Sequence, residues 1–282
     1  MAHVFAMQRA RVSDVELEFE VQGSGEPVVL IHGSNVAAEF LPLLREPALS
    51  DYALIRYHRR GMAGSSRTGP ASIQQQAADC AGLLAQLGVQ AAHVVGRSYG
   101  GPIALQLALD APARVHTLAL LEPALFMVPS GAAFFEQLAP VAERYQRGDP
   151  AAAVELFLQG VGRPNARESV ERAVPGGFEQ AVRDADTFFQ VELPAIQAWT
   201  FTQADAGRIT QPVLYVLGAE SLPLMAEVRE LVHAWFPQTQ DLLVPGASHF
   251  LQLENAAAVA EGLQAFYRAN PAPVCISGET ER

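Results

Sequence analysis

A serine flanked by two glycines, at the point where an apolar strand pattern gives way to a helical one, most constrains this chain. The apolar run at 92–95 favours a strand, the sequence Gly-Arg-Ser-Tyr-Gly occupies positions 96–100, and a helical apolar pattern follows. A serine on so tight a strand-to-helix turn has strained backbone angles, and its neighbours two positions away must be small. Gly96 and Gly100 meet that demand. The spacing therefore predicts a nucleophile elbow, with Ser98 at a helix N-terminus, where free N–H groups favour negative charge.

Short apolar runs alternate with longer helix-like segments along much of the chain. The expected strands are 4–12, 15–21, 28–31, 53–57, 92–95, 115–121, 213–217 and 242–244. The first two flank Ser13-Asp14, a turn signal, and are expected to form an antiparallel hairpin. The expected helices are 72–87, 101–109, 225–236 and 256–268. This alternation predicts an α/β fold with a mostly parallel sheet covered by helices.

The alternation of strand and helix patterns stops between residues 124 and 206, where no clear strand pattern occurs. This stretch has helical patches, Pro/Gly breaks and many aromatic residues. We interpret it as a helical cap, inserted into a core domain that comprises residues 1–123 and 207–269. The tail at 270–282 has two prolines and few large apolar residues, and is expected to be flexible.

Composition and charge narrow the range of partners. The chain has 30 acidic and 19 basic residues, a net charge of -11, which would repel phosphate backbones and disfavours nucleic acid. No basic run suits an anionic membrane and no apolar run approaches a membrane span. The two cysteines, Cys80 and Cys275, cannot form a disulfide framework or a CxxC metal pattern. Residues 1–11 lack a signal-peptide pattern. We expect a cytoplasmic protein with a small-molecule substrate and no metal; its oligomeric state stays open.

Two backbone N–H groups are candidates for an oxyanion hole. A tetrahedral intermediate needs two such donors that converge on its oxygen. One is the N–H of Tyr99, directly after the serine of the elbow. The other is the N–H of Ser34, which follows the expected strand 28–31 and the His32-Gly33 pair. Gly33 would let the chain turn tightly enough to aim this donor, and His32 is interpreted as structural.

The chain has seven histidines, and His249 is the preferred general base. It stands in the segment 245–250, directly after the last expected strand. Loops at strand ends carry catalytic groups on a rigid frame. The order of Ser98 and then His249 also agrees with the order that the elbow motif implies. Apart from His32, the remaining histidines lie near the N-terminus or in or beside expected strands and a helix: His3, His58, His93, His116 and His233.

With these motifs together, the chain resembles the α/β-hydrolase fold family over nearly its whole length. The stretches that carry the resemblance are 28–34, 59–66 (Arg-Arg-Gly-Met-Ala-Gly-Ser-Ser), 96–101, 213–218 and 245–249. The resemblance implies an eight-stranded sheet with a cap inserted after the sixth strand. It also implies a covalent acyl-enzyme mechanism without a cofactor. A serine rather than an aspartate at the nucleophile position disfavours the dehalogenase and epoxide-hydrolase branches.

The third member of the expected triad departs from the family pattern. The family usually places an aspartate a few residues after the seventh strand, and Ser221 stands at that place. A serine cannot stabilise an imidazolium as a carboxylate does. Glu122, which follows the sixth strand, is the preferred substitute, because certain dehalogenases and mycotoxin lactone hydrolases look as if they supply the acid from that strand end. Glu220 is the alternative.

Three functions fit this pattern. The first is hydrolysis of a carboxylic ester or lactone of a small to medium apolar substrate. The second is carbon–carbon bond hydrolysis or cofactor-free perhydrolysis on the same triad. The third is a ligand-binding receptor with vestigial activity, which Ser98, His249 and the oxyanion loop disfavour. The aromatics of the expected cap indicate an apolar pocket. The candidates to line it are Phe126, Phe188, Phe189 and Trp199.

Overall fold

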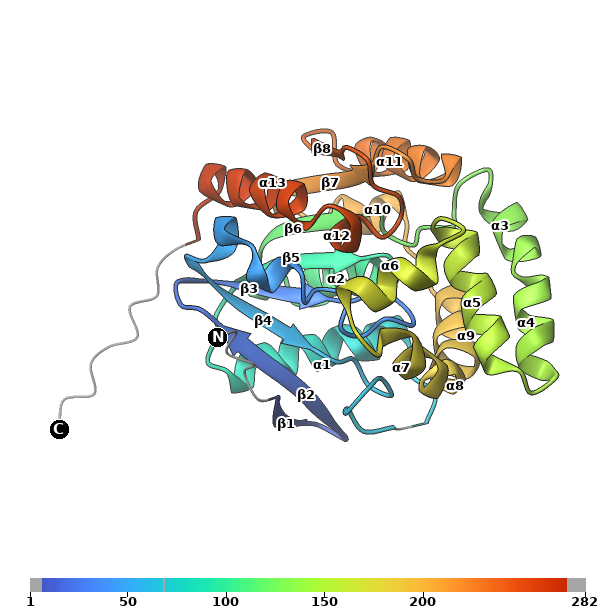
Figure 1. The fold of residues 1–282 in the computed structure, drawn as a ribbon. Helices are drawn as coiled ribbons and strands as arrows, with labels where there is room; N and C mark the ends of the chain where they lie inside the picture. Colours follow the sequence, from blue (N-terminus) through green and yellow to red (C-terminus); the bar gives the residue numbers. More distant parts are fainter. Residues whose placement is uncertain (1–6, 68, 273–282) are drawn as a thin grey trace.

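The computed structural model describes residues 7–67 and 69–272 and shows one eight-stranded sheet with helices on both faces (Figure 1). The strands lie in the order β1-β2-β4-β3-β5-β6-β7-β8, and neighbouring strands pair parallel except β1 with β2 and β2 with β4, because β2 alone runs in the opposite direction. The expected α/β class and mostly parallel sheet are confirmed. The strand bounds are β1 Gln8–Val12, β2 Val15–Gln22, β3 Glu26–Ile31, β4 Tyr52–Tyr57, β5 Ala92–Arg97, β6 Val115–Leu121, β7 Val213–Gly218 and β8 Gln240–Val244.

The expected N-terminal hairpin is present as β1 and β2. The two strands pair antiparallel, with Val12 opposite Val15. Ser13 in the turn has a φ of 52°, the left-handed conformation that tight hairpin turns require. The first strand was expected to begin at residue 4. Residues 4–6 lie outside the described part of the chain, as do residues 273–282 of the expected tail, and the described strand begins at Gln8.

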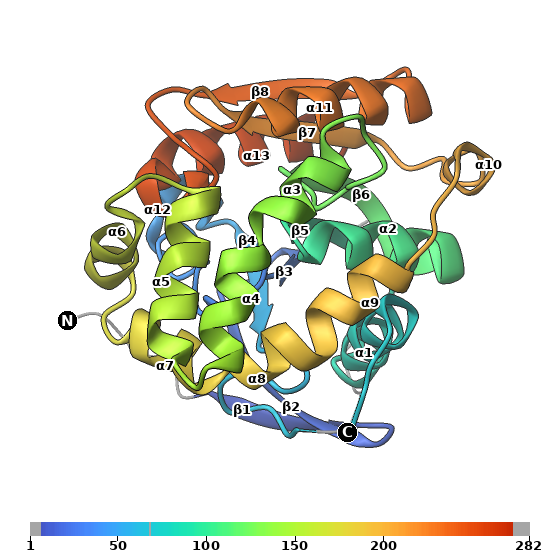
Figure 2. The ribbon, with the colours of Figure 1, turned by 90° about the vertical axis from the view of Figure 1, so that its right-hand side faces the viewer.

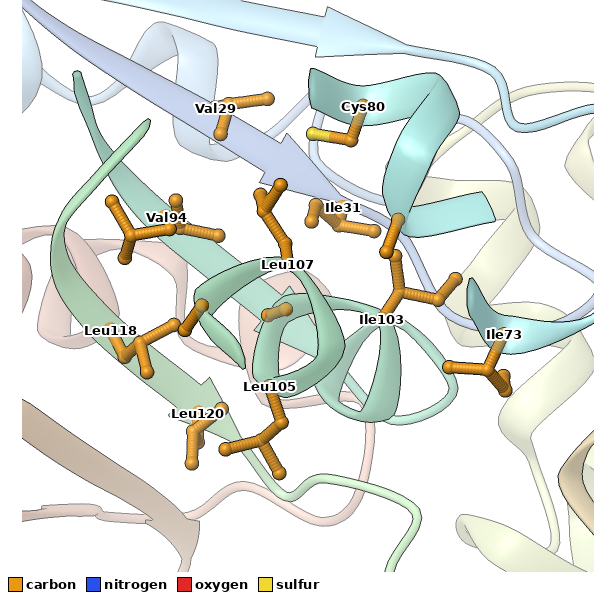
Figure 3. Close-up of a cluster of buried hydrophobic side chains, with 14 of the residues drawn as sticks. Val29, Ile31, Ile73, Cys80, Val94, Ile103, Leu105, Leu107, Leu118 and Leu120 are labelled. Carbon is orange, nitrogen blue, oxygen red and sulfur yellow. The ribbon is translucent and has the colours of Figure 1, made fainter. Parts of the chain in front are cut away.

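One face of the sheet is covered by α1 (Ile73–Gln86), α2 (Gly100–Asp110) and α11 (Pro223–Trp235). Val29 and Ile31 of β3 point into this layer (Figure 3). They pack there with Ile73 and Cys80 of α1, Ile103, Leu105 and Leu107 of α2, and Val94, Leu118 and Leu120 of the neighbouring strands.

The opposite face is covered by α13 (Ala256–Ala269) and two short turns, η1 (Leu43–Arg45) and η2 (Pro47–Leu49). Val28 and Leu30 of β3 pack on this side. Successive side chains of a strand point to opposite faces, so a strand that is covered on both faces needs an unbroken apolar run. This explains the run at 28–31 and fixes the strand at the centre of the sheet.

Helix α1 shows how local signals set its ends. The Ser72 side chain accepts a hydrogen bond from the backbone N–H of Gln75 at 3.1 Å, which satisfies one of the free donors at the helix start. At the other end Gly88 has a φ of 71°, which glycine adopts without steric cost. The helix that was expected at 72–87 therefore spans Ile73–Gln86.

The chain between β6 and β7 is helical, and its helices α3 to α9 lie across one end of the sheet (Figure 2). We call residues 131–198 the inserted helices. They share a small apolar core, built from Val154, Leu158, Val170, Phe178 and neighbours, which also contacts Val36 and Phe250 of the sheet domain. The elements are α3 Gly131–Gln137, α4 Ala139–Gln146, α5 Pro150–Val161, α6 Ala166–Ala173, α7 Gly177–Arg183, α8 Ala185–Thr187, the π-helical turn η4 Phe188–Glu192, α9 Leu193–Ala198 and then α10 Gln203–Ala206.

Two short helices complete the fold. The turn η3 (Pro112–Arg114) precedes β6, and α12 (Leu251–Glu254) follows the loop after β8 and was not expected from the sequence. Within residues 7–67 and 69–272, no helix combines the length and the apolar character needed to cross a membrane.

Candidate active site

Ser98 lies on the sharp turn between β5 and α2. Its φ is 48°, a strained value for a residue other than glycine. A Cβ atom on Gly96 would lie 2.5 Å from the backbone oxygen of Gly100, and one on Gly100 would lie 2.1 Å from the backbone oxygen of Ile31. Both neighbours must therefore be glycine, as the motif predicts. The backbone N–H of Ser98 donates to the carbonyl of Leu121 at 3.0 Å, which holds the turn against the end of β6.

Three side chains from separate strand ends form a continuous hydrogen-bonded line. His249 Nε2 lies 3.1 Å from Ser98 Oγ, and His249 Nδ1 lies 2.7 Å from Glu122 Oε2. With a neutral imidazole, Nδ1–H donates to the carboxylate and Nε2 accepts the proton of the serine hydroxyl. Ser98 follows β5, Glu122 follows β6 and His249 lies in the loop after β8, so the parallel strands bring all three to one edge of the sheet.

The Glu122 carboxylate is buried and hydrogen-bonded through both oxygens. Its Oε1 atom accepts from the backbone N–H of Gly218 at 2.7 Å and from the Ser221 hydroxyl. Burial alone would raise the pKa of Glu122, but the hydrogen bond and charge of His249, with the Ser221 and Gly218 bonds, bring that pKa below its ordinary value. The Glu122 carboxyl group is therefore held in its ionised form. Its φ of 43° is a second strained backbone position at the site.

Glu220, the alternative acid, lies elsewhere. Its side chain is 57% exposed and pairs with Arg163, with Nη2 of the arginine 2.6 Å from Oε2. The structure thus brings Glu122 to His249 and directs Glu220 to the surface.

The surroundings of the His249 imidazole favour its neutral form. Burial is the largest influence that lowers its pKa, the charge of Arg97 lowers it further, and the Glu122 carboxylate raises it in opposition. The net pKa lies below the ordinary histidine value. The Arg97 guanidinium donates to the backbone oxygen of His249 at 2.8 Å and pairs with the buried Glu39 at 3.0 Å, which fixes the loop that carries the histidine.

The two expected oxyanion donors lie beside Ser98. Ser34 and Tyr99 line the same pocket as the serine, and in the described part of the chain neither backbone N–H has a hydrogen-bond partner. Gly33 packs against Ser98, since a Cβ atom at Gly33 would lie 3.0 Å from Ser98 Cβ. The Gly33 N–H donates to Glu39 Oε1 at 2.6 Å, which holds the loop in place.

His32 supports that loop from below and does not line the pocket. Its Nδ1 lies 2.7 Å from the oxygen of Gly33, and its Nε2 accepts the Arg59 backbone N–H at 3.0 Å. Burial, followed by the charge of Arg59, holds the pKa of His32 well below its usual range. A neutral imidazole that is hydrogen-bonded at both ring nitrogens has the environment of a structural residue, which is the interpretation made from sequence.

The pocket in front of Ser98 has about 580 Å³ of empty space, open solvent at its mouth included, and a mainly apolar wall. Phe126 and Phe188 line it, as two of the four candidate aromatics. Phe189 instead stacks on Tyr145, with ring centroids 4.1 Å apart, and Trp199 donates to Gln106 at 2.8 Å in the main core. The apolar wall is Ala124, Phe126, Phe134, Phe135, Leu138, Phe157, Val161, Phe188, Leu193, Ile196, Leu222 and Met225, and the polar lining is Ser34, Ser98, Tyr99, Glu192 and His249.

Two further residues at the site were not expected from the sequence. Arg59 and Glu192 form a buried ion pair, with Nη2 of the arginine 2.5 Å from Oε1 of the glutamate. Arg59 also donates to the backbone oxygens of His32 at 3.0 Å and Gly33 at 2.9 Å, and its guanidinium lies 4.7 Å from the centre of the Tyr99 ring. The only signal was an acidic residue within the mostly apolar stretch 188–193, because the partners are 133 positions apart.

Within the described residues, no three or more His, Cys, Asp or Glu side chains gather in a way that could hold a metal ion.

The chain is similar to known proteins in sequence and in fold. The family model described as "alpha/beta hydrolase fold" matches residues 26–256. The chain is 37% identical over 116 residues to a putative carbamate hydrolase of Azorhizobium caulinodans, covering 41% of this chain and 44% of that protein. It is 34% identical over 125 residues to rhodomycin D methylesterase DnrP of Streptomyces peucetius, covering 41% and 42%. The chain therefore spans less than half the length of both relatives.

A solved structure extends the likeness to the whole fold. An esterase from Thermogutta terrifontis superposes with a TM-score of 0.77 at 23% identity, covering 95% of this chain and all of the other. This likeness concerns the fold, and the family match covers most of the sequence. The chain belongs to the α/β-hydrolase fold family.

Proposed function

We propose that this protein is a serine hydrolase that cleaves a carboxylic ester or lactone of small to medium size through an acyl-enzyme. The observation that carries the proposal is the hydrogen-bonded line from Ser98 through His249 to Glu122, which opens onto an apolar pocket. A nucleophile, a base and an orienting acid within hydrogen-bond reach of one another are the arrangement that acyl transfer requires.

The first half-reaction would form the acyl-enzyme. His249 Nε2 takes the proton of the Ser98 hydroxyl as Oγ attacks the carbonyl carbon, and Glu122 stabilises the imidazolium that forms. The negative charge on the carbonyl oxygen rests on the backbone N–H groups of Ser34 and Tyr99. The tetrahedral intermediate collapses, its C–O bond breaks, and His249 returns the proton to the leaving alkoxide.

The second half-reaction would regenerate the serine. His249 removes a proton from a water molecule, whose oxygen attacks the acyl carbon of the Ser98 ester. The same two N–H groups hold the second oxyanion. The intermediate then releases the carboxylic acid, and Ser98 recovers its proton from His249. For a lactone the alcohol stays attached to the acyl group, so one ring-opened product leaves.

The pocket favours apolar substrates, because twelve of its lining residues are apolar. The relative named as a methylesterase supports ester cleavage as the class of reaction. Within the described residues no metal-ligand cluster lines the pocket. The proposed reaction uses the side chains named above and backbone donors.

Turnover of para-nitrophenyl butyrate tests the proposal. We expect wild-type turnover that falls by about three to six orders of magnitude in Ser98→Ala and in His249→Ala, because each removes one member of a unit. His233→Ala is the matched control, since His233 contacts Asp241 near the surface at 3.0 Å and should leave the rate unchanged. Equal rates in the wild type and Ser98→Ala would refute the proposal.

A further inference from the structure

Glu192 is the one acidic side chain in the pocket wall, among the described residues, and the proposed mechanism gives it no role. It is 1% exposed and lies in the pocket that contains Ser98 and His249. It ends the π-helical turn η4, between α8 and α9 of the inserted helices. Turns of this kind are rare and often mark functional positions, because the widened turn re-aims the side chains that it carries.

The two oxygens of Glu192 have different surroundings. Oε1 is bound by Arg59 Nη2 at 2.5 Å, and the guanidinium supplies the matching charge. Oε2 is buried and accepts no hydrogen bond from the described residues. A carboxylate oxygen has strong acceptor capacity, and a buried acceptor is normally satisfied. Since Oε1 is bound to Arg59, Oε2 is the oxygen left to accept a hydrogen bond from a ligand.

We propose that Glu192 is a specificity-determining residue, whose Oε2 accepts a hydrogen bond from a hydroxyl or N–H group of the substrate. The inference rests on the proposed function and deepens it: the preferred ester or lactone carries an apolar body and one hydrogen-bond donor. A charged acceptor in an apolar pocket strongly favours a ligand that donates to it, because the alternative leaves a buried polar group unpaired.

If Glu192 has only a structural role, we expect the opposite substrate preference. If the residue only ties the inserted helices to the sheet domain, a substrate hydroxyl would enter an apolar pocket without a partner and would be penalised. A second tie of that kind exists outside the pocket, where Asp184 Oδ2 accepts the backbone N–H of Ala63 at 2.8 Å. Asp184→Asn is therefore a matched control for loss of a buried acid between the two regions.

The probes are para-nitrophenyl hexanoates with a hydroxyl group, a methoxy group or hydrogen at either the β-carbon or the terminal carbon. Hydroxyl donates and accepts, methoxy only accepts, and hydrogen does neither. For the wild type we expect the hydroxyl ester to exceed both the methoxy and the unsubstituted ester in kcat/KM by about tenfold at one of the two positions. Values within twofold of each other at both positions, or a lower value for the hydroxyl esters, would overturn the inference.

Glu192→Gln replaces the acceptor that faces the substrate by a hydrogen-bond donor. Arg59 has only donors, so the glutamine carbonyl should keep the bond to it and the NH₂ group should replace Oε2. We expect the hydroxyl-to-methoxy ratio of kcat/KM to fall about tenfold in Glu192→Gln and to stay unchanged in Asp184→Asn. An unchanged ratio in Glu192→Gln, or an equal fall in Asp184→Asn, would contradict a direct contact. The wild-type comparison decides the matter without any variant.

The design also separates this inference from the proposed function. Hydrolysis of all the esters without a preference for hydroxyl refutes the role of Glu192 alone. Failure to hydrolyse any of them, by folded protein, refutes the proposed function and the inference together.

Discussion

Ser221 donates its hydroxyl hydrogen to the Glu122 carboxylate, whose other oxygen binds His249. Ser221 occupies the place after β7 where the resemblance leads one to expect an aspartate. Glu122 reaches the same spot from the end of the adjacent strand β6, as shown by its bond to the backbone N–H of Gly218 at 2.7 Å. In the proposed triad the acid function would thus be divided, with a carboxylate from one strand end and a supporting hydroxyl from the next.

Replacing the proposed acid should disable the base. In Glu122→Gln the carboxylate that holds His249 and stabilises its charged form is lost, so we expect kcat to fall about 10²–10⁴-fold. Glu220→Gln is the control, because Glu220 pairs with Arg163 at the surface, and its rate should stay within about twofold of wild type. Steady-state kinetics on para-nitrophenyl butyrate measures both, and the reverse ranking would assign the acid to Glu220.

The supporting hydroxyl should have a smaller, measurable effect. Ser221→Ala removes one donor from an ionised, buried carboxylate, and we expect kcat to fall about tenfold. In a Glu122→Gln background, Ser221→Asp places a carboxylate where the resemblance expects one. We expect this double variant to turn over at least about tenfold faster than Glu122→Gln alone. If a folded double variant shows no recovery, a carboxylate at position 221 cannot replace Glu122 as the partner of His249.

The pH dependence of kcat/KM follows from His249. The base must be neutral to accept a proton, so activity is present above its pKa and is lost as pH falls through it. Burial and Arg97 hold that pKa below the ordinary value of about 6.5, and the acid limb should therefore lie below that pH. Glu122 raises the pKa of His249, so the residual activity of Glu122→Gln should have its acid limb at still lower pH. A limb above the ordinary histidine value would contradict this account of the base.

The elbow should tolerate no side chain at its second glycine. A Cβ atom on Gly100 would lie 2.1 Å from the backbone oxygen of Ile31, so Gly100→Ala should destabilise the protein by about 2–3 kcal/mol and lower activity. Gly160 in α5 has no atom within 4 Å of such a Cβ. Gly160→Ala should therefore stabilise the fold by about 0.5–1 kcal/mol through its better helix propensity. Urea denaturation of both variants measures the difference, and equal stabilities would be evidence against the steric account.

The sheet and its elbow were predictable because their physics is local. The apolar run at 28–31 indicates a strand buried on both faces, and glycines at 96 and 100 indicate a turn without room for Cβ atoms. His249 could be selected among seven histidines by its place after the last strand. Within the described residues, the bounds of the expected strands and of the four helices expected at 72–87, 101–109, 225–236 and 256–268 were right within a few residues.

The remaining features depend on contacts between distant residues. The choice between Glu122 and Glu220 turns on side-chain direction and on a φ of 43° at Glu122, which no local pattern reveals. The pair formed by Arg59 and Glu192 joins positions 133 apart. The residues of the pocket wall could not be selected from sequence for the same reason. Phe134, Phe135 and Phe157 line the pocket, while Phe189 and Trp199 pack elsewhere. All five are aromatic residues of one helical stretch.

The measurement that most directly tests the central claim is labelling of the intact protein by a fluorophosphonate probe, with the modified peptide located by mass spectrometry. Only a serine activated by a neighbouring base reacts rapidly with this reagent. The account predicts modification of Ser98 alone, abolished in His249→Ala and retained in His233→Ala. A folded wild-type protein that remains unlabelled, or that is labelled at another serine, would contradict it.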